Sequence, residues 1–332
     1  MTTSERSMPI RLTASRCLAI GLLLAAIGVG LMSSLRLALA AEPAANPVLA
    51  EAATTPGRIL FVHAGDIWSM ANGRVDAVTH DGGWEQPEAS PDGSRIVAVG
   101  MYASASELFL LDPDGSNERQ LTRNRRTPAG DSNWAFRPKW APDGSSIAFV
   151  TDRSSFYPML WRMNPDGSGL RQIVFPNNGL DAIDSFNWSP DGRFIAATRF
   201  LSARSQVYVI DPARPAGARA LTSGDGAFDP SWSPDGTFVT YIAREGNRNV
   251  IYAVDAQSGG RPVQLADAEL ARSPVWSPLG NSIAYVGLVG GVFEIFSFNV
   301  TVSGSEITAS SRPVALTSRL GVDPISGLSW SQ

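Results

Sequence analysis

Two histidines are the only imidazole groups in this sequence, and acidic residues lie close to both of them. His63 follows the apolar run of residues 58–62, and His80 precedes Asp81 and Glu85. Imidazole and carboxylate groups can bind a metal ion or transfer protons in acid–base catalysis. A candidate metal or acid–base site therefore consists of His63, His80, Asp81 and Glu85. The competing interpretation, polar loop residues beside an acidic turn, is favoured because two histidines make a sparse ligand set.

Nucleophilic catalysis has little support in the sequence. The one cysteine, Cys17, lies within an apolar N-terminal run, and the Gly-x-Ser-x-Gly pattern of serine hydrolases does not occur. A chain processed after this run contains no thiol for a disulfide, a zinc cluster or haem attachment. No cofactor is predicted.

A second candidate site combines arginine with aromatic side chains, a composition typical of binding hot spots. It covers the irregular connection of residues 123–137 and a nearby connection that contains Arg153. Long irregular loops on rigid scaffolds often carry function. The alternative is a solvated basic loop in which Trp134 fills the space left by Ala89. The predicted binding residues are Arg125, Arg126, Trp134, Phe136, Arg137, Arg153 and Tyr157.

The composition describes the protein that must position these groups. Of the 332 residues, 44% are hydrophobic and 17% are charged, which is typical of a folded chain. The net charge of -4 gives no overall electrostatic attraction to nucleic acid. The 31 Gly and 23 Pro residues indicate frequent tight turns.

The N-terminus has the layout of an export signal. Arg6, Arg11 and Arg16 precede the uncharged run of residues 17–35, and Ala38-Leu39-Ala40 offers a cleavage site. Residues 1–40 are therefore predicted to be a signal peptide or, if uncleaved, a signal anchor, and residues 41–56 a linker. Either outcome places the following domain outside the cytoplasm, in the periplasm or beyond.

A repeated turn organises the remainder of the chain. Its copies, or near copies, of Trp-Ser-Pro-Asp-Gly contain Pro91, Pro142, Pro190, Pro234 and Pro278, spaced by 44 to 51 residues. A period of 40 to 50 residues in a strand-rich chain points to propeller blades. Proline sets the backbone angle of the second turn position, and glycine accepts the left-handed conformation that lets two strands pair.

Each repeat contains four candidate strands, here called a to d. Strand a ends at the Trp of the turn, b is a short apolar run such as Ile147-Ala148-Phe149-Val150, and d is short, as in Gln120-Leu121-Thr122. Residues 58–79 supply b, c and d without an a strand, whereas Leu328-Ser329-Trp330-Ser331 supplies only the missing a. The sequence therefore predicts an all-β, six-bladed β-propeller of four-stranded antiparallel blades over residues 57–332, with the C-terminal strand joining the N-terminal blade.

The repeated Trp-Ser-Pro-Asp-Gly, the b-strand Ile-Ala-Phe-Val and the Asp-Pro-Asp-Gly-Ser that ends strand c resemble the TolB-like, or PD40, propeller repeat. This resemblance implies an exported propeller that binds other proteins or peptides. TolB proteins carry an α/β domain ahead of the propeller, whereas here about 16 residues separate the predicted signal from strand b. Only the general binding role is therefore expected to carry over.

The function predicted from these observations is a non-enzymatic, exported binding module. Its expected partner is a protein, a peptide or another component of the cell envelope, bound by a monomer, with membrane contact only through a possible N-terminal anchor. The alternative is a small-molecule enzyme, such as a lyase or lactonase, with a metal site at the mouth of the propeller.

Overall fold

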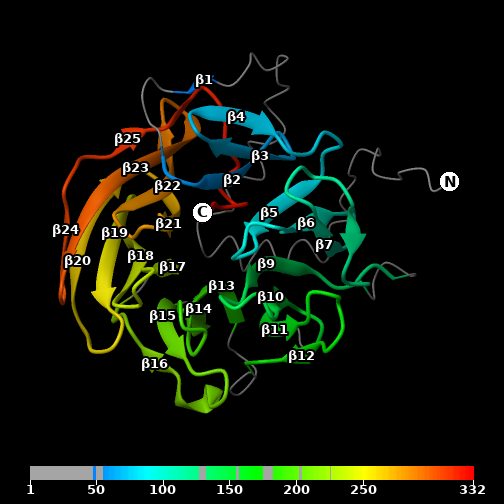
Figure 1. Ribbon diagram of the computed structural model, residues 1–332. Coiled ribbons are helices and arrows are strands. Elements are labelled where there is room, and N and C mark those ends of the chain that lie inside the picture. Colours follow the sequence, from blue (N-terminus) through cyan, green and yellow to red (C-terminus); the bar gives the residue numbers. More distant parts are fainter. Residues whose placement is uncertain are drawn as a thin grey trace.

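The described residues form six antiparallel β-sheets of four or five strands arranged around a common centre, and one further two-stranded sheet (Figure 1). The computed structural model describes residues 55–126, 132–154, 157–174, 182–201, 204–224 and 226–332, together with the short strand β1 (Val48–Leu49). In this part of the chain no helix is long and apolar enough to cross a membrane. The predicted all-β six-bladed propeller is confirmed. The predicted signal or anchor, residues 1–40, lies outside the described residues.

Five blades follow one another along the chain, each with strand a nearest the centre. The strands of blade 1 are β5 (Trp84–Ala89), β6 (Ile96–Met101), β7 (Ser106–Leu111) and β8 (Arg119–Gln120). Those of blade 2 are β9 (Ala135–Trp140), β10 (Ile147–Thr151), β11 (Met159–Met163) and β12 (Arg171–Gln172). Those of blade 3 are β13 (Ala182–Trp188), β14 (Ile195–Leu201), β15 (Arg204–Ile210) and β16 (Arg219–Ala220).

The later blades have longer outer strands. Blade 4 contains β17 (Ala227–Trp232), β18 (Phe238–Glu245), β19 (Arg248–Asp255) and β20 (Gly259–Ala268). Blade 5 contains β21 (Ala271–Trp276), β22 (Ser282–Val289), β23 (Val292–Ser303) and β24 (Glu306–Ala309), and β25 (Val314–Ala315) also pairs with β23. A 3-10 turn, Pro215–Gly217, precedes β16.

The sixth, closing blade joins the two ends of the propeller. Its strand a is β27 (Ser329–Ser331), which pairs antiparallel with β2 (Arg58–His63), and β3 (Asp66–Ala71) and β4 (Arg74–Ala77) complete the sheet. Within the predicted linker, β1 pairs with β26 (Thr317–Ser318). A short segment of that linker is thus ordered against blade 5.

The Pro-Asp-Gly turns form for the expected reason, since each places a glycine at positive φ, as at Gly93 (φ 69°). The aspartate also caps its turn, because Asp92 accepts a hydrogen bond from Ser90 Oγ (2.6 Å) and another from Ser94 N (3.1 Å). The Ser90 hydroxyl, followed by Ser94, lowers the pKa of Asp92 to about 2. We call the end of the propeller that carries these turns the turn face, and the opposite end the loop face.

The core lies between neighbouring blades, where apolar side chains of strands b and c meet the next sheet. One cluster joins Val99 and Leu108 of blade 1 to Trp140 and Phe149 of blade 2. Because every strand b is buried on both faces, these runs are continuously apolar instead of alternating.

Candidate functional site

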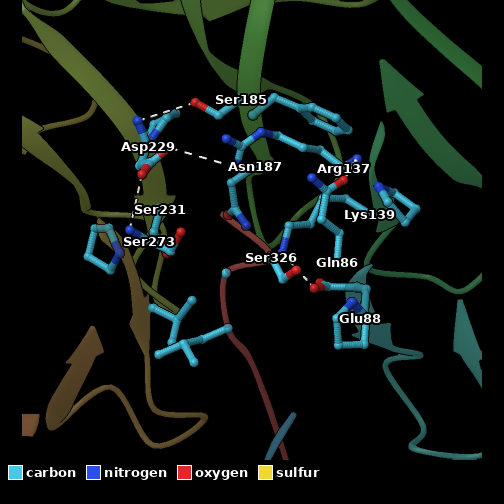
Figure 2. A pocket seen from close by; sticks show the side chains of 18 residues that line it. Gln86, Glu88, Arg137, Lys139, Ser185, Asn187, Asp229, Ser231, Ser273 and Ser326 are labelled. Carbon is cyan, nitrogen blue, oxygen red and sulfur yellow. Dashed lines mark hydrogen bonds and ion pairs between the residues drawn. The ribbon is translucent and has the colours of Figure 1, made fainter. Parts of the chain in front are cut away.

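The inner strands enclose a narrow polar cavity at the centre of the propeller (Figure 2). It has a volume of about 60 Å³, enough for a few water molecules and well below the roughly 300 Å³ at which small-molecule sites usually begin. Its wall is built from one short segment of each strand a and from the chain before β27. The polar residues of this wall include Gln86, Glu88, Arg137, Lys139, Ser185, Asn187, Asp229, Ser231, Ser273 and Ser326.

A bulge in strand a turns these side chains toward the cavity. The register of all five complete inner strands shifts at this point. In four of them the bulged residue has a φ near +50°, which non-glycine residues rarely adopt, and a proline follows it. Such a conformation costs about 1–3 kcal/mol per residue and persists only where its surroundings hold it. The four residues are Gln86, Arg137, Asp229 and Ser273.

Hydrogen bonds between neighbouring blades hold these bulges in place. The amide of Arg137 donates to Gln86 Oε1 of the preceding blade (2.6 Å). The amide of Asp229 donates to Ser185 Oγ (3.2 Å), and the amide of Ser273 donates to Asp229 Oδ2 (3.1 Å). At three junctions, therefore, a side chain of one blade satisfies the main-chain donor that the bulge frees in the next.

Asp229 is the electrostatic centre of this arrangement. Its side chain is 3% exposed, with Arg272 Nε 3.1 Å from Oδ2 and Arg137 Nη1 3.8 Å from Oδ1. Arg137 Nη2 also lies 3.8 Å from Asp184 Oδ2. Burial alone would raise the pKa of Asp229, but Arg272 and Arg137 hold that pKa below its usual range. For Arg137, burial acts to lower the pKa, and the carboxylates, Asp184 foremost, raise it above its usual value.

A second ion pair lies nearer the turn face. Lys139 Nζ of blade 2 donates to Glu88 Oε2 of blade 1 at 2.5 Å. Burial raises the pKa of Glu88, and the attraction of Lys139 offsets only part of that effect. The charged side chains of the cavity wall, in this pair and at the bulges, thus form ion pairs between different blades.

The loop face carries most of the residues predicted for partner binding. Arg125 and Arg126 are exposed, and the Arg125 guanidinium lies 4.7 Å from the centre of the Tyr102 ring. Trp134 stacks on Phe136 with ring centroids 5.9 Å apart. Its amide donates to Asp152 Oδ1 (2.8 Å), which places it beside the connection between β10 and β11. That connection carries exposed Arg153 and half-buried Tyr157.

Two of the predicted binding residues do not belong to the loop. β9 begins at Ala135, so Phe136 and Arg137 lie in a strand and the crossover ends earlier than predicted. Arg137 lines the central cavity together with Asp229 (Figure 2), and its guanidinium lies 3.8 Å from both Asp229 and Asp184. The structure therefore brings Arg125, Arg126, Trp134 and Arg153 together and places Arg137 apart from them. The ring contact of Trp134 is with Phe136, and Ala89 packs in a different cluster, with Leu60 and Trp84.

Three residues of the candidate metal site, His63, Asp81 and Glu85, interact with different groups, and the fourth, His80, is exposed. His63 Nδ1 lies 3.2 Å from Gly321 O, and its ring meets Trp68 edge-on. Asp81 Oδ1 accepts the Trp84 indole N–H (2.8 Å), and His80 is exposed. The negative charge of Glu85 helps to raise the pKa of Arg137. No group of three His, Cys, Asp or Glu side chains placed to hold a metal ion occurs among the residues that the structure describes.

A buried carboxylate at the start of strand c fixes the crossover that presents the loop-face arginines. Glu107 is 1% exposed and accepts hydrogen bonds from Thr122 Oγ1 (2.5 Å), Asn124 N (2.6 Å) and Arg125 N (2.8 Å). The closing blade and blade 5 repeat this arrangement with Asp66 and Glu294. In blades 1 and 5, therefore, the Thr of the repeated Leu-Thr pair is the partner of a buried acid, Glu107 or Glu294.

We expect the substitution Glu107→Ala to loosen this crossover. Three donors would lose their acceptor, at a cost of about 1–3 kcal/mol for each one that stays buried. Hydrogen exchange of the Asn124 and Arg125 amides should accelerate, and trypsin should cut after Arg125 or Arg126 more readily. Glu306→Ala, at an exposed position of β24, serves as the control. Unchanged exchange at both amides would show that Glu107 does not hold the segment.

The repeated turns do not indicate the residues of the central cavity. The available signal is a proline two residues before the end of strand a, as in Arg137-Pro138 and Asp229-Pro230. This proline recurs at a constant distance before the Trp-Ser-Pro turn or its near copy, and it follows the bulged residue in four blades.

Comparisons with known proteins agree with this geometry. Residues 66–279 match the family model described as the TolB beta propeller domain. A Tol-Pal system protein TolB of Anaeromyxobacter dehalogenans is 35% identical over 174 residues, which are 52% of this chain and 36% of that protein. The chain thus spans about a third of the length of such curated relatives.

Solved structures show the same fold at low sequence identity. TolB from Acinetobacter baumannii superposes with a TM-score of 0.66 at 18% identity, covering 84% of this chain and 67% of that one. An oligogalacturonate lyase in complex with manganese gives a TM-score of 0.54 at 16% identity, covering 79% and 78% of the two chains. At such identities the likeness concerns the fold alone. The family match over most of the propeller, with six blades of the expected topology, shows that the chain belongs to the TolB beta propeller domain family.

Proposed function

We propose that this protein is an exported binding module of the cell envelope that captures a protein or peptide partner on the loop face around blades 1 and 2. The observation that carries the proposal is the crossover between β8 and β9, which presents exposed arginines beside an aromatic pair. Arginine and tryptophan are the residues most enriched at binding hot spots. The similarity to TolB of the Tol-Pal system supports an envelope partner.

The alternative function, a small-molecule enzyme at the propeller mouth, has its support in the fold that this chain shares with oligogalacturonate lyase. The central cavity of about 60 Å³ favours the binding module, because a sugar ring needs several times that volume. The charged side chains of the cavity also already form ion pairs with residues of other blades, which leaves fewer of them to bind a substrate.

The proposal is tested by crosslinking and affinity capture with the full chain in its native envelope. A triple variant, Arg125→Ala, Arg126→Ala and Trp134→Ala, should lose most of the captured partner, since hot-spot truncations each cost more than about 1 kcal/mol. A matched variant with Arg193→Ala, Arg261→Ala and Arg312→Ala removes exposed arginines elsewhere and should retain capture. Equal capture by the triple variant and the wild type would refute the assignment of the site.

A further inference from the structure

Four exposed arginines, here called the loop-face patch, lie on two connections of the loop face that hydrogen bonds join, although the protein as a whole is acidic. Arg123, Arg125, Arg126 and Arg153 are all exposed, while the net charge of the chain is -4. None of the four forms an ion pair with a carboxylate among the described residues. The arginines of the central cavity, in contrast, are matched by Asp184 and Asp229.

Hydrogen bonds hold the main chain at Arg125 and Arg126, so these two guanidinium groups extend from a main chain in a defined position. Asn133 N donates to Asn124 O (3.0 Å), which joins the two ends of the crossover, and Arg126 N donates to Ser132 Oγ (2.9 Å). Glu107 Oε1 accepts a hydrogen bond from the Arg125 amide. Such preorganisation reduces the entropy that the protein loses when a partner binds.

Among the described residues, the two carboxylates that are hydrogen-bonded to this crossover, Glu107 and Asp152, accept from the scaffold. Glu107 is buried and its oxygens accept from Thr122 and from main-chain amides, and Asp152 Oδ1 accepts the Trp134 amide. Their hydrogen-bonding capacity is directed at the scaffold instead of the arginines. The positive charge of the patch is therefore left for a partner, and guanidinium groups pair with carboxylates through two parallel hydrogen bonds.

The aromatic groups of the patch favour a peptide over a glycan or a lipid surface. Arg125 covers one face of the Tyr102 ring, and Trp134 stacks on Phe136 at an interplanar angle of 7°, so one face of each of these rings is engaged and not open to stack on a sugar. The exposed large hydrophobic side chains of the described residues, which a lipid surface would need, all lie elsewhere. They are Val263, Leu279, Val289, Val292 and Val314.

We infer that the loop-face patch of Arg123, Arg125, Arg126 and Arg153 recognises an acidic peptide segment, rich in Asp or Glu, of the partner. The inference rests on the proposed function and assigns the chemistry of the partner at that site. Attraction between the patch and an acidic segment also accelerates encounter, which makes the association rate fall as salt rises.

The test measures binding of a fluorescent glutamate–serine peptide to the full-length protein at low and at physiological ionic strength. The wild type should bind it with an affinity that decreases with salt. The variant Arg123→Ala, Arg125→Ala, Arg126→Ala and Arg153→Ala should bind about tenfold more weakly or not at all. A control variant with the same change in charge, Arg171→Ala, Arg193→Ala, Arg261→Ala and Arg312→Ala, should bind like the wild type.

Three results would overturn the inference: no binding of the peptide, equal weakening by the two variants, or tighter binding of a polyuronate or of vesicles with anionic lipids. The capture experiment separates this inference from the proposed function. If Trp134→Ala abolishes capture of the native partner while the four-arginine variant retains it, the binding site stands and its acidic specificity fails. If neither variant affects capture, the site itself is wrong.

Discussion

Replacing Asp229 by Asn should lower the free energy of unfolding by about 3–5 kcal/mol, the largest effect expected for a single substitution in this protein. The carboxylate is 3% exposed and lies near both Arg272 and Arg137, so its loss leaves Arg272 without this partner and Arg137 with only the attraction of Asp184 and Glu85 among the described residues. Asn keeps the size of the side chain and an acceptor for the Ser273 amide. The loss would therefore be electrostatic and not a cavity effect.

The measurement is urea unfolding of the two proteins as a function of pH. Because the pKa of Asp229 is held below its usual range in the folded state, its contribution is complete above the unfolded value of about 4. The contribution disappears as pH falls through the folded pKa. The difference between wild type and variant should thus be full at neutral pH and shrink in strong acid. Asp76→Ala, in an exposed pair with Arg74, should change stability by less than about 1 kcal/mol. A stability difference that does not depend on pH would contradict this account.

Deleting residues 325–332 should abolish the soluble monomer. The deletion removes β27, which pairs with β2, and it removes buried Leu328, which packs in the core of the closing blade. It also removes Trp330, whose indole donates to Pro56 O (2.8 Å). Burial of Leu328 contributes about 1.5–3 kcal/mol, partly buried Trp330 less, and every lost ladder hydrogen bond about 1 kcal/mol. β2 would then be an unpaired edge strand and a template for aggregation.

Size-exclusion chromatography and thermal melting test this expectation. Removal of Gln332 alone, an exposed residue outside β27, should leave both unchanged. A synthetic peptide of residues 325–332 should partly restore the monomer, since it can add to β2 as the missing strand. A soluble monomer with the melting temperature of the wild type would show that β27 is not needed to close the propeller.

Much of this fold was accessible from the sequence because its determinants are local and repeated. Each Pro-Asp-Gly turn fixes a hairpin, and the continuous apolar run after it identifies a strand buried on both faces. The short d strands were harder to delimit. The segment predicted at Gln120-Leu121-Thr122 is the strand Arg119–Gln120, because Thr122 turns its hydroxyl to Glu107 instead of continuing the ladder.

The candidate site was only partly predictable. Arginines and tryptophan in an irregular connection stand out in any sequence, so the crossover was found. Arg137 lies in the central cavity and not in the crossover. Its partners there are Asp184 and Asp229, which lie 47 and 92 positions further along the chain. Contacts of this kind arise only when blades close into a circle, and a single sequence does not reveal which polar residues will face one another.

The three hydrogen bonds that hold the bulges run in one direction, with an acceptor side chain on one blade and a main-chain donor on the next. At these three junctions the blades therefore join head to tail, like subunits in a cyclic assembly. Asp229 takes part on both sides of its blade, because its amide donates to Ser185 and its carboxylate accepts from the Ser273 amide. A duplicate of blade 4 would therefore bring both halves of the contact with it and leave no bulge donor unmatched.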